Sequence, residues 1–271
     1  QLGNELTEEV RLLEKQKLAL GTDNTPYETE KRFGPTLVDA YIIDTASGER
    51  TKALERIKYL YDSSPDGRYL PYILDDHFWL YDTQESKSRN LTESLDTSFI
   101  NKERNTLTDH SNPYGSVTWT KGGGGLVLYD KFDLWWFAAD GSETKRLTKG
   151  KQSKIVHRWV NLDPEEEEID PEKPLYLSLY GDRTKKYGYA EMTIGETLET
   201  RVWTEKNLSS LQKAKDADIY CYLEQDFDDS PDYQVGGKDL NGMRQVTDTN
   251  PFQMDYQWGH SELIKIGRAH V

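Results

Sequence analysis

The chain has 271 residues, with 48 Asp and Glu against 34 Lys and Arg, which gives a net charge of -14. Such an acidic chain repels phosphate backbones, which argues against a nucleic-acid-binding function. It contains no run of about 18 apolar residues, so no membrane-spanning helix is expected, and its 35% hydrophobic content suffices for one large β domain with a polar surface.

The first predicted element is a short helix between Glu5 and Leu20, within a lead-in segment of residues 1–30. Apolar side chains fall at helical spacing, and Thr7 with the acidic pair after it suits a helix start. The spaced positions are Leu6, Val10, Leu13, Lys17 and Leu20.

A recurring unit then runs along the chain: an aromatic-rich strand, a tight turn with Asp or Gly, and a basic strand ending in Leu-Thr or Val-Thr. Three clear copies and two weaker ones are present: Phe78–Thr92, Asp133–Thr148, Pro231–Thr247, Ala40–Leu54 and Tyr189–Trp203. The steps between the matching residues Leu54, Leu91, Leu147, Val202 and Val246 are 37, 56, 55 and 44 residues. Strand repeats with steps of roughly 40 to 50 residues indicate propeller blades or a related β-array.

Strand and turn chemistry support this interpretation. Aromatic, β-branched and leucine-rich runs occur at residues 41–43, 78–81 and 175–180, as is typical of strands. Hairpin dipeptides that tolerate a positive φ occur at Ser47-Gly48, Asp66-Gly67 and Asp140-Gly141. The predicted fold is therefore all-β, an incomplete β-propeller of about four to five antiparallel blades with a short N-terminal helix.

Residues with reactive side chains are sparse and scattered. The single cysteine, Cys221, lies in a strand-like run and is interpreted as a buried structural thiol. No Gly-x-Ser-x-Gly nucleophile motif occurs, so we assign no catalytic residue to this chain. Four histidines stand singly and are interpreted as surface or strand residues: His77, His110, His157 and His260.

Three clusters resemble ligand sites but are better explained as loops. The acidic stretch 163–170 concentrates carboxylates that a hard cation could use, yet consecutive like charges usually form a solvated loop. Residues 226–232 lack the spacing of an EF-hand. Gly122–Gly125 is not followed by Lys and Ser or Thr, so it predicts a hairpin rather than a phosphate loop. We therefore expect no metal and no cofactor.

The segment Ser64–Leu70, SPDGRYL, predicts a Ser-Pro-Asp-Gly turn between two strands. In this context it resembles the strand-turn signature of TolB-like propellers and of the propeller in prolyl-oligopeptidase-type serine peptidases. Further stretches resemble consecutive parts of a bacterial group of that peptidase family, and together they cover nearly the whole chain: 113–137, 160–189, 213–222, 229–235 and 246–264.

This resemblance implies a propeller that precedes an α/β-hydrolase domain, with Trp258–Leu263 leading into that domain. It implies that the interdomain contact involves Pro251, Trp258, Gly259, Glu262 and Leu263. The implied partners are the chain's own missing hydrolase domain and, in the intact protein, short peptide substrates. A periplasmic or secreted parent is favoured by the same resemblance.

The last six residues, 266–271, look like the translation of a sequencing adapter. We therefore expect a fragment truncated at both ends, with blades over residues 31–257 and the start of a linker over 258–265. The fragment itself should be inactive, and the resemblance implies that its parent is a serine peptidase. The alternative is a stand-alone TolB-like propeller that binds a protein partner, and a carbohydrate-active propeller would need two acidic residues facing one pocket.

Overall fold

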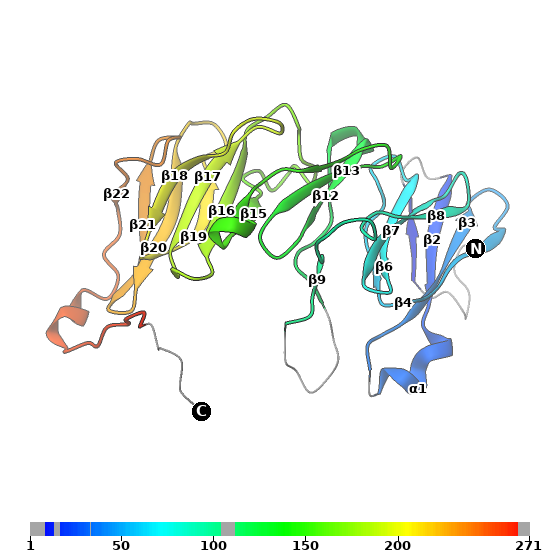
Figure 1. Cartoon of the computed structure of the whole chain (residues 1–271), viewed down its shortest axis with the longest axis horizontal. Coiled ribbons are helices and arrows are strands. Elements are labelled where there is room, and N and C mark those ends of the chain that lie inside the picture. Colours follow the sequence, from blue (N-terminus) through cyan, green and yellow to red (C-terminus); the bar gives the residue numbers. More distant parts are fainter. Residues whose placement is uncertain (1–8, 14–16, 33, 104–111, 265–271) are drawn as a thin grey trace. The chain divides into compact units, whose positions relative to one another are not determined.

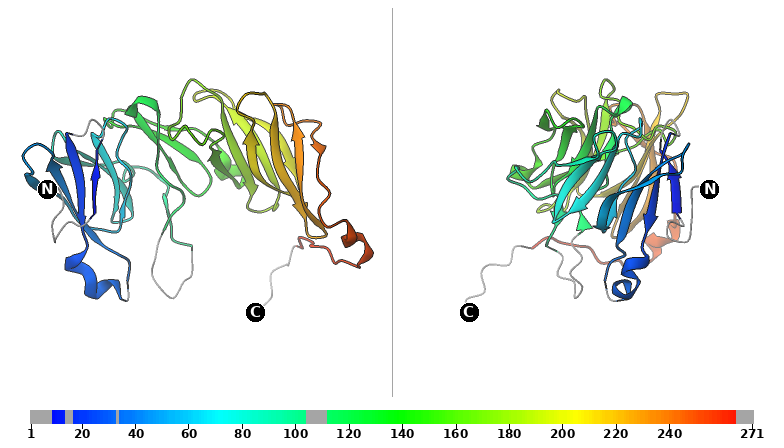
Figure 2. Two further views of the ribbon diagram at one scale, coloured as in Figure 1. Left: turned by 180° about the vertical axis from the view of Figure 1, so that it is seen from behind. Right: turned by 90° about the vertical axis from the view of Figure 1, so that its right-hand side faces the viewer.

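A computed structural model describes residues 9–13, 17–32, 34–103 and 112–264 of the chain (Figure 1). In these residues, 22 strands form six antiparallel sheets. Five sheets have four strands each, which pair in chain order, and the sixth pairs β9 with β10. Figure 2 shows the strands of each four-stranded sheet side by side from two further directions.

The strands of the first three sheets lie in the N-terminal half of the chain. They are β1 (Glu9–Leu12), β2 (Leu18–Asp23), β3 (Val38–Asp44), β4 (Arg50–Ile57), β5 (Tyr59–Leu60), β6 (Tyr69–Leu74), β7 (His77–Asp82), β8 (Lys87–Asn90), β9 (Ile100–Asn101) and β10 (Asn112–Pro113).

The remaining three sheets follow in the same pattern. Their strands are β11 (Thr118–Trp119), β12 (Gly125–Tyr129), β13 (Leu134–Ala138), β14 (Thr144–Arg146), β15 (Ile155–Val160), β16 (Leu175–Gly181), β17 (Tyr187–Met192), β18 (Glu199–Thr204), β19 (Asn207–Lys213), β20 (Tyr220–Asp226), β21 (Asp229–Gly236) and β22 (Arg244–Gln245). Of these, β11–β14, β15–β18 and β19–β22 are the three four-stranded sheets.

In the described residues, helical structure is limited to short segments of three to five residues. The α-helices are α1 (Glu28–Lys31) and α2 (Gly150–Ser153), and the 3-10 helices are η2 (Thr25–Tyr27), η3 (Lys121–Gly123) and η4 (Pro251–Asp255). In the part of the chain that the structure describes, no helix has the length and apolar character needed to cross a membrane.

The prediction of a helix between Glu5 and Leu20 is wrong for the residues described there. Residues 9–12 form β1 and residues 18–20 begin β2, which pairs along its whole length with β3. The short helix of this region is α1 instead. The sheet partner overrides the helical spacing because β2 gains a complete ladder of backbone hydrogen bonds from β3. The first sheet therefore begins inside the stretch that the sequence assigns to a lead-in segment.

The recurring sequence unit is confirmed as the third and fourth strands of each four-stranded sheet. Residues 78–92 contain β7 and β8, and residues 133–148 contain β13 and β14. The hairpin glycines Gly48, Gly67 and Gly141 have φ values of 76°, 72° and 76°, as their turns require.

The Leu-Thr ending extends the pairing of the fourth strand beyond its last assigned residue. Leu91 N–H donates to the carbonyl oxygen of Phe78 at 2.8 Å, and Phe78 N–H donates to Thr92 Oγ1 at 3.0 Å. The last sheet repeats both contacts with Val246, Thr247 and Tyr233 at 2.9 Å each. The threonine hydroxyl thus satisfies a backbone donor of the third strand after the strand pairing stops.

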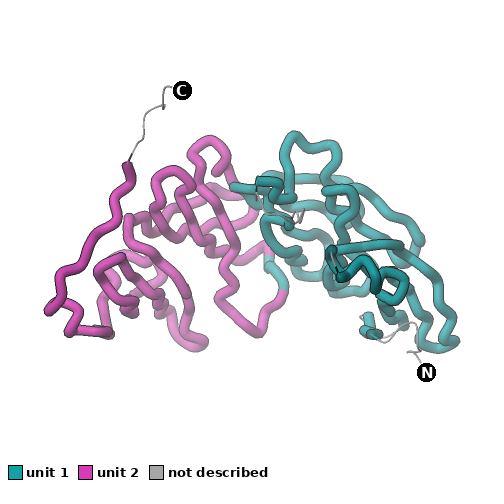
Figure 3. Tube along the Cα trace, turned by 90° about the horizontal axis from the view of Figure 1, so that it is seen from below, with its two compact units in different colours: residues 1–147, 168–170 teal, residues 148–167, 171–271 magenta. Residues whose placement is uncertain are grey.

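The chain divides into two compact units, residues 1–147 with 168–170 and residues 148–167 with 171–271 (Figure 3). In the first unit, the sheet β5–β8 buries both of its faces. One face, with Leu70, Tyr72 and Tyr81, packs on β1–β4, and the other, with Phe78 and Leu80, packs on β11–β14. The alternation along β6 and β7 follows the twofold periodicity of a strand.

The core of the second unit lies between β15–β18 and β19–β22. Its buried side chains are mostly tyrosines, with Tyr176 of β16 5.4 Å from Tyr220 of β20 and Tyr189 of β17 5.7 Å from Tyr222, measured between ring centroids. The aromatic residues of the recurring unit therefore pack sheet against sheet.

Candidate functional site

The residues assigned to an interdomain contact lie in the last described stretch of the chain. Pro251 begins η4, and Trp258, Gly259, Glu262 and Leu263 follow it in irregular chain outside the sheet β19–β22 (Figure 1). The apolar members of this stretch are largely exposed: Phe252, Met254, Tyr256, Trp258, Leu263 and Ile264. Apolar side chains gathered in the open are typical of an interaction surface.

Polar contacts fasten this stretch to the turn between β20 and β21. Asn250 Nδ2 donates to Ser230 Oγ at 2.9 Å, and Ser230 Oγ donates to Gln253 Oε1 at 2.7 Å. Gln253 Nε2 donates to the carbonyl oxygen of Asp228. Trp258 Nε1 donates to the carbonyl oxygen of Gln253 at 2.7 Å, which closes a loop over η4.

Phe227 belongs to the same surface although the sequence did not identify it. It lies at the turn between β20 and β21, is 59% exposed, and a Cβ atom placed on Gly259 would lie 3.7 Å from its Cε1. A phenylalanine flanked by Asp226 and Asp228 at a hairpin tip is a signal that sequence reasoning could have used, because turns rarely favour a large apolar residue.

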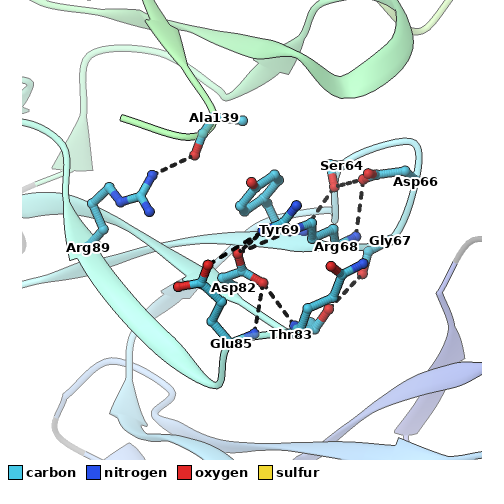
Figure 4. A network of polar contacts seen from close by, with 11 residues as sticks. Ser64, Asp66, Gly67, Arg68, Tyr69, Asp82, Thr83, Glu85, Arg89 and Ala139 are labelled. Atoms are coloured by element: carbon cyan, nitrogen blue, oxygen red, sulfur yellow. Dashed lines mark hydrogen bonds and ion pairs between the residues drawn. The ribbon is translucent and has the colours of Figure 1, made fainter. Parts of the chain in front are cut away.

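A second polar site surrounds the Ser-Pro-Asp-Gly turn (Figure 4). Ser64 Oγ accepts from Tyr69 N–H at 2.9 Å and donates to Asp66 Oδ1 at 2.5 Å, and Asp66 Oδ1 also accepts from Arg68 N–H at 3.1 Å. All of these groups satisfy one another, so the turn is structural, as the sequence predicts.

Arg68 continues this network into the sheet. Its Nε and Nη2 donate to Asp82 Oδ2 at 3.0 and 2.7 Å. Burial alone would raise the pKa of Asp82, but the Arg68 hydrogen bonds and the N–H groups of Glu85 and Gln84 hold it below its ordinary value. A carboxylate held charged and paired in this way is a structural element rather than a proton donor.

Arg89 links β5–β8 to the sheet β11–β14 in the same unit. Its Nη1 donates to the carbonyl oxygen of Ala139 at 3.1 Å (Figure 4). A Cβ atom on Gly141 would lie 2.6 Å from Arg89 Cδ, so a larger residue there would displace the arginine. The adjoining cavity of about 120 Å³, lined by residues that include Tyr69, Lys87 and Arg89, is too small for a peptide.

Of the remaining sequence candidates, only His260 lies within one of these sites, in the stretch from Trp258 to Leu263. His77 is in β7 with Nδ1 3.3 Å from Thr92 Oγ1, His157 is buried in β15, and His260 follows η4. His110 and residues 265–271 lie outside the described residues. Cys221 is half-buried rather than buried, because it points to the face of β20 opposite Tyr220 and Tyr222, which make the core.

The acidic stretch 163–170 forms a loop, and several of its carboxylates have protein partners. Lys173 Nζ pairs with Glu166 at 2.9 Å, and Lys215 Nζ pairs with Glu165 at 3.0 Å. Gly122–Gly125 makes the predicted hairpin between β11 and β12, with positive φ at Gly122 and Gly123.

Comparison with solved structures identifies the architecture. Dipeptidyl peptidase 4 from Porphyromonas gingivalis superposes with a TM-score of 0.52 at 8% identity, over 90% of this chain and 40% of that chain. A protein from Bacteroides ovatus described as a dipeptidyl aminopeptidase IV superposes with a TM-score of 0.54 at 11% identity, again over 90% and 40%. The fold is that of β-propeller blades.

The predicted all-β propeller class, with about four to five antiparallel blades, is thereby confirmed, and the described residues contain five four-stranded blades. The propeller chain spans 40% of the length of each of these two structures. No family model matches the sequence, and no curated protein matches it either.

Proposed function

We propose that this chain is the non-catalytic propeller portion of a prolyl-oligopeptidase-family serine peptidase, and that it restricts peptide access to a hydrolase domain that this sequence does not contain. The observation that carries the proposal is the pairing of two facts. Two solved structures with TM-scores above 0.5 are named as dipeptidyl peptidase 4 and as a dipeptidyl aminopeptidase IV, and 90% of this chain matches 40% of each.

The sequence resemblance supports the same proposal from independent residues. Trp258–Leu263 matches the stretch that leads into the hydrolase domain in such peptidases, and it lies in the exposed part of the chain after the last blade. We therefore propose that residues 258–265 begin a linker and that Pro251, Trp258, Gly259, Glu262 and Leu263 contact the hydrolase domain. The covalent chemistry would belong to a serine of that domain.

The experiment is to recover the longer reading frame and to express both it and the 271-residue chain. We expect a Gly-x-Ser-x-Gly motif within a few hundred residues after Leu263. The longer protein should hydrolyse chromogenic dipeptide substrates, and the 271-residue chain should not.

Two results would overturn the proposal. Serine-hydrolase turnover by the 271-residue chain would place the chemistry inside the propeller. A stop codon soon after Leu263 in the recovered frame would favour the alternative, a stand-alone TolB-like propeller that binds a protein partner.

A further inference from the structure

Five exposed apolar residues lie at the β20–β21 turn and in the stretch that follows the last blade. We call Phe227, Phe252, Met254, Tyr256 and Trp258 the aromatic surface. Phe252 and Tyr256 meet edge to face with ring centroids 6.5 Å apart. Phe227 lies beside the backbone that follows Trp258, as the close approach of its ring to Gly259 requires.

The aromatic surface is held in a defined shape by the contacts of Ser230, Asn250 and Gln253 described above. These contacts join the Ser230 side chain of β21 and the carbonyl oxygen of Asp228 to the side chains of Asn250 and Gln253. A fixed arrangement matters for recognition, because a surface that is ordered before binding loses less conformational entropy when a partner docks.

Exposed carboxylates flank members of the aromatic surface in the sequence: Asp226 and Asp228 stand on either side of Phe227, and Asp255 stands between Met254 and Tyr256. The neighbouring Asp229 pairs with Lys206 Nζ at 3.3 Å. An acidic rim repels acidic partners and favours a partner with a basic rim.

We infer that the aromatic surface docks a folded domain of the same polypeptide whose facing patch is apolar and ringed by lysine and arginine. This inference rests on the proposed function, under which that domain is the hydrolase. Apolar contact at the centre supplies the affinity, and the opposite charges at the rim set the orientation. Phe227, Phe252 and Tyr256 thereby join the interface, beyond the residues that the sequence resemblance implies.

Methionine oxidation can measure this contact, since the chain has three methionines with different exposure. Met254 is 92% exposed and lies in the aromatic surface, Met192 is 3% exposed in the core, and Met243 is half-buried. Hydrogen peroxide converts accessible methionine to the sulfoxide, and mass spectrometry of peptides gives the rate at each position. In the 271-residue chain, Met254 should oxidise fastest and Met192 slowest.

In the longer gene product at low salt, we expect Met254 to oxidise much more slowly than in the 271-residue chain, at a rate close to that of Met192. The protection should weaken at about 1 M salt, where the Debye length is about 3 Å. The double variant Phe252→Ser, Tyr256→Ser should restore fast oxidation of Met254 in the longer protein. The matched control is Ile219→Ser, which removes an exposed apolar residue of the same unit at the opposite end of β20 and should leave the protection intact.

The outcomes separate this inference from the proposed function. If a hydrolase domain follows and is active but Met254 oxidises as fast as in the 271-residue chain, the docking surface is wrong and the proposed function stands. If a different domain follows and protects Met254, the proposed function fails and the docking surface stands. Protection of Met254 in the 271-residue chain that grows with its concentration would show that a second copy is the occupant and would overturn the inference.

Discussion

The hydroxyl group of Tyr61 is buried and makes no hydrogen bond to any described residue. Its ring stacks on Phe78, with centroids 5.8 Å apart. Burial raises the pKa of Tyr61 well above its ordinary value, since the charged phenolate would lose its water. Tyr27 offers the opposite case, because its hydroxyl donates to Asp39 Oδ1 at 2.6 Å.

The variant Tyr61→Phe should therefore keep or raise the stability of the fold, by up to about 1 kcal/mol, because it removes a polar atom that left water without gaining a partner. The control Tyr27→Phe should lower the stability, because it leaves Asp39 without one of its donors. Urea unfolding of both variants measures the difference. A clear loss of stability in Tyr61→Phe would mean that its hydroxyl has a partner after all.

At the scale of strands, three blades have an acidic residue on the third strand, or directly before it, that contacts a donor on the fourth strand thirteen positions later. The pairs are Asp39 with Lys52, Asp133 with Arg146, and Asp232 with Gln245. Each joins two neighbouring strands of one hairpin on the same face. The spacing can be found in the sequence alone, so the pairing is a further mark of the recurring unit.

Arg146→Met tests what this pairing contributes. Asp133 is fully buried, and removing its cation leaves a carboxylate in the core, whereas methionine keeps the packing on Trp135. We expect a loss of about 2 kcal/mol, less than for a fully buried pair because 32% of the Arg146 side chain is exposed.

The matched control for this variant is Lys145→Met on the same strand. Lys145 also lies over a tryptophan, Trp136, but its partner Glu143 is exposed. Its loss should change the stability little, because exposed ion pairs contribute little. Equal effects of the two substitutions in urea unfolding would show that the burial of Asp133 is unimportant.

The third and fourth strands could be predicted because their signals are local: alternation, a turn dipeptide and a basic strand follow one another within about 15 residues. The N-terminal strands could not, because Val10 and Leu20 fit a helix equally well and only pairing with β3 decides between the two. In the candidate site, the sequence resemblance pointed to Trp258. The contacts of Ser230 and Phe227 depend on a fold-back between distant segments, which no local pattern reports.

For the whole molecule, the paired carboxylates predict the acid limit of stability. Burial alone would raise the pKa of Asp39 and Asp82, but hydrogen bonds from Lys52 and Arg68, among others, hold both below the ordinary value. Such groups stabilise the fold above their unfolded pKa of about 3.9, and this contribution is lost as the pH falls through the lower folded pKa. The urea concentration at the unfolding midpoint should therefore decrease once the pH is lowered below about 4.

The buried tyrosines predict a loss of stability at alkaline pH, because folding raises their pKa instead of lowering it. The hydrogen bond to Asp39, together with burial, raises the pKa of Tyr27 to about 12. Its contribution is complete below the unfolded pKa of about 10 and is lost as the pH rises toward the folded value. A urea midpoint that stays constant from pH 5 to pH 3 would contradict the predicted acid limit of stability. A urea midpoint that increases above pH 10 would contradict the predicted alkaline limit.

Strand pairing in every four-stranded blade joins only segments that follow one another in the sequence. During synthesis, all partners of a blade have therefore left the ribosome once roughly 40 to 50 residues of that blade have emerged. Each blade can form its hydrogen bonds before the next is made, although its apolar face stays uncovered until the following blade of the unit arrives. Translation itself thus presents the strands in the order in which they pair, and a pause between blades would favour correct pairing.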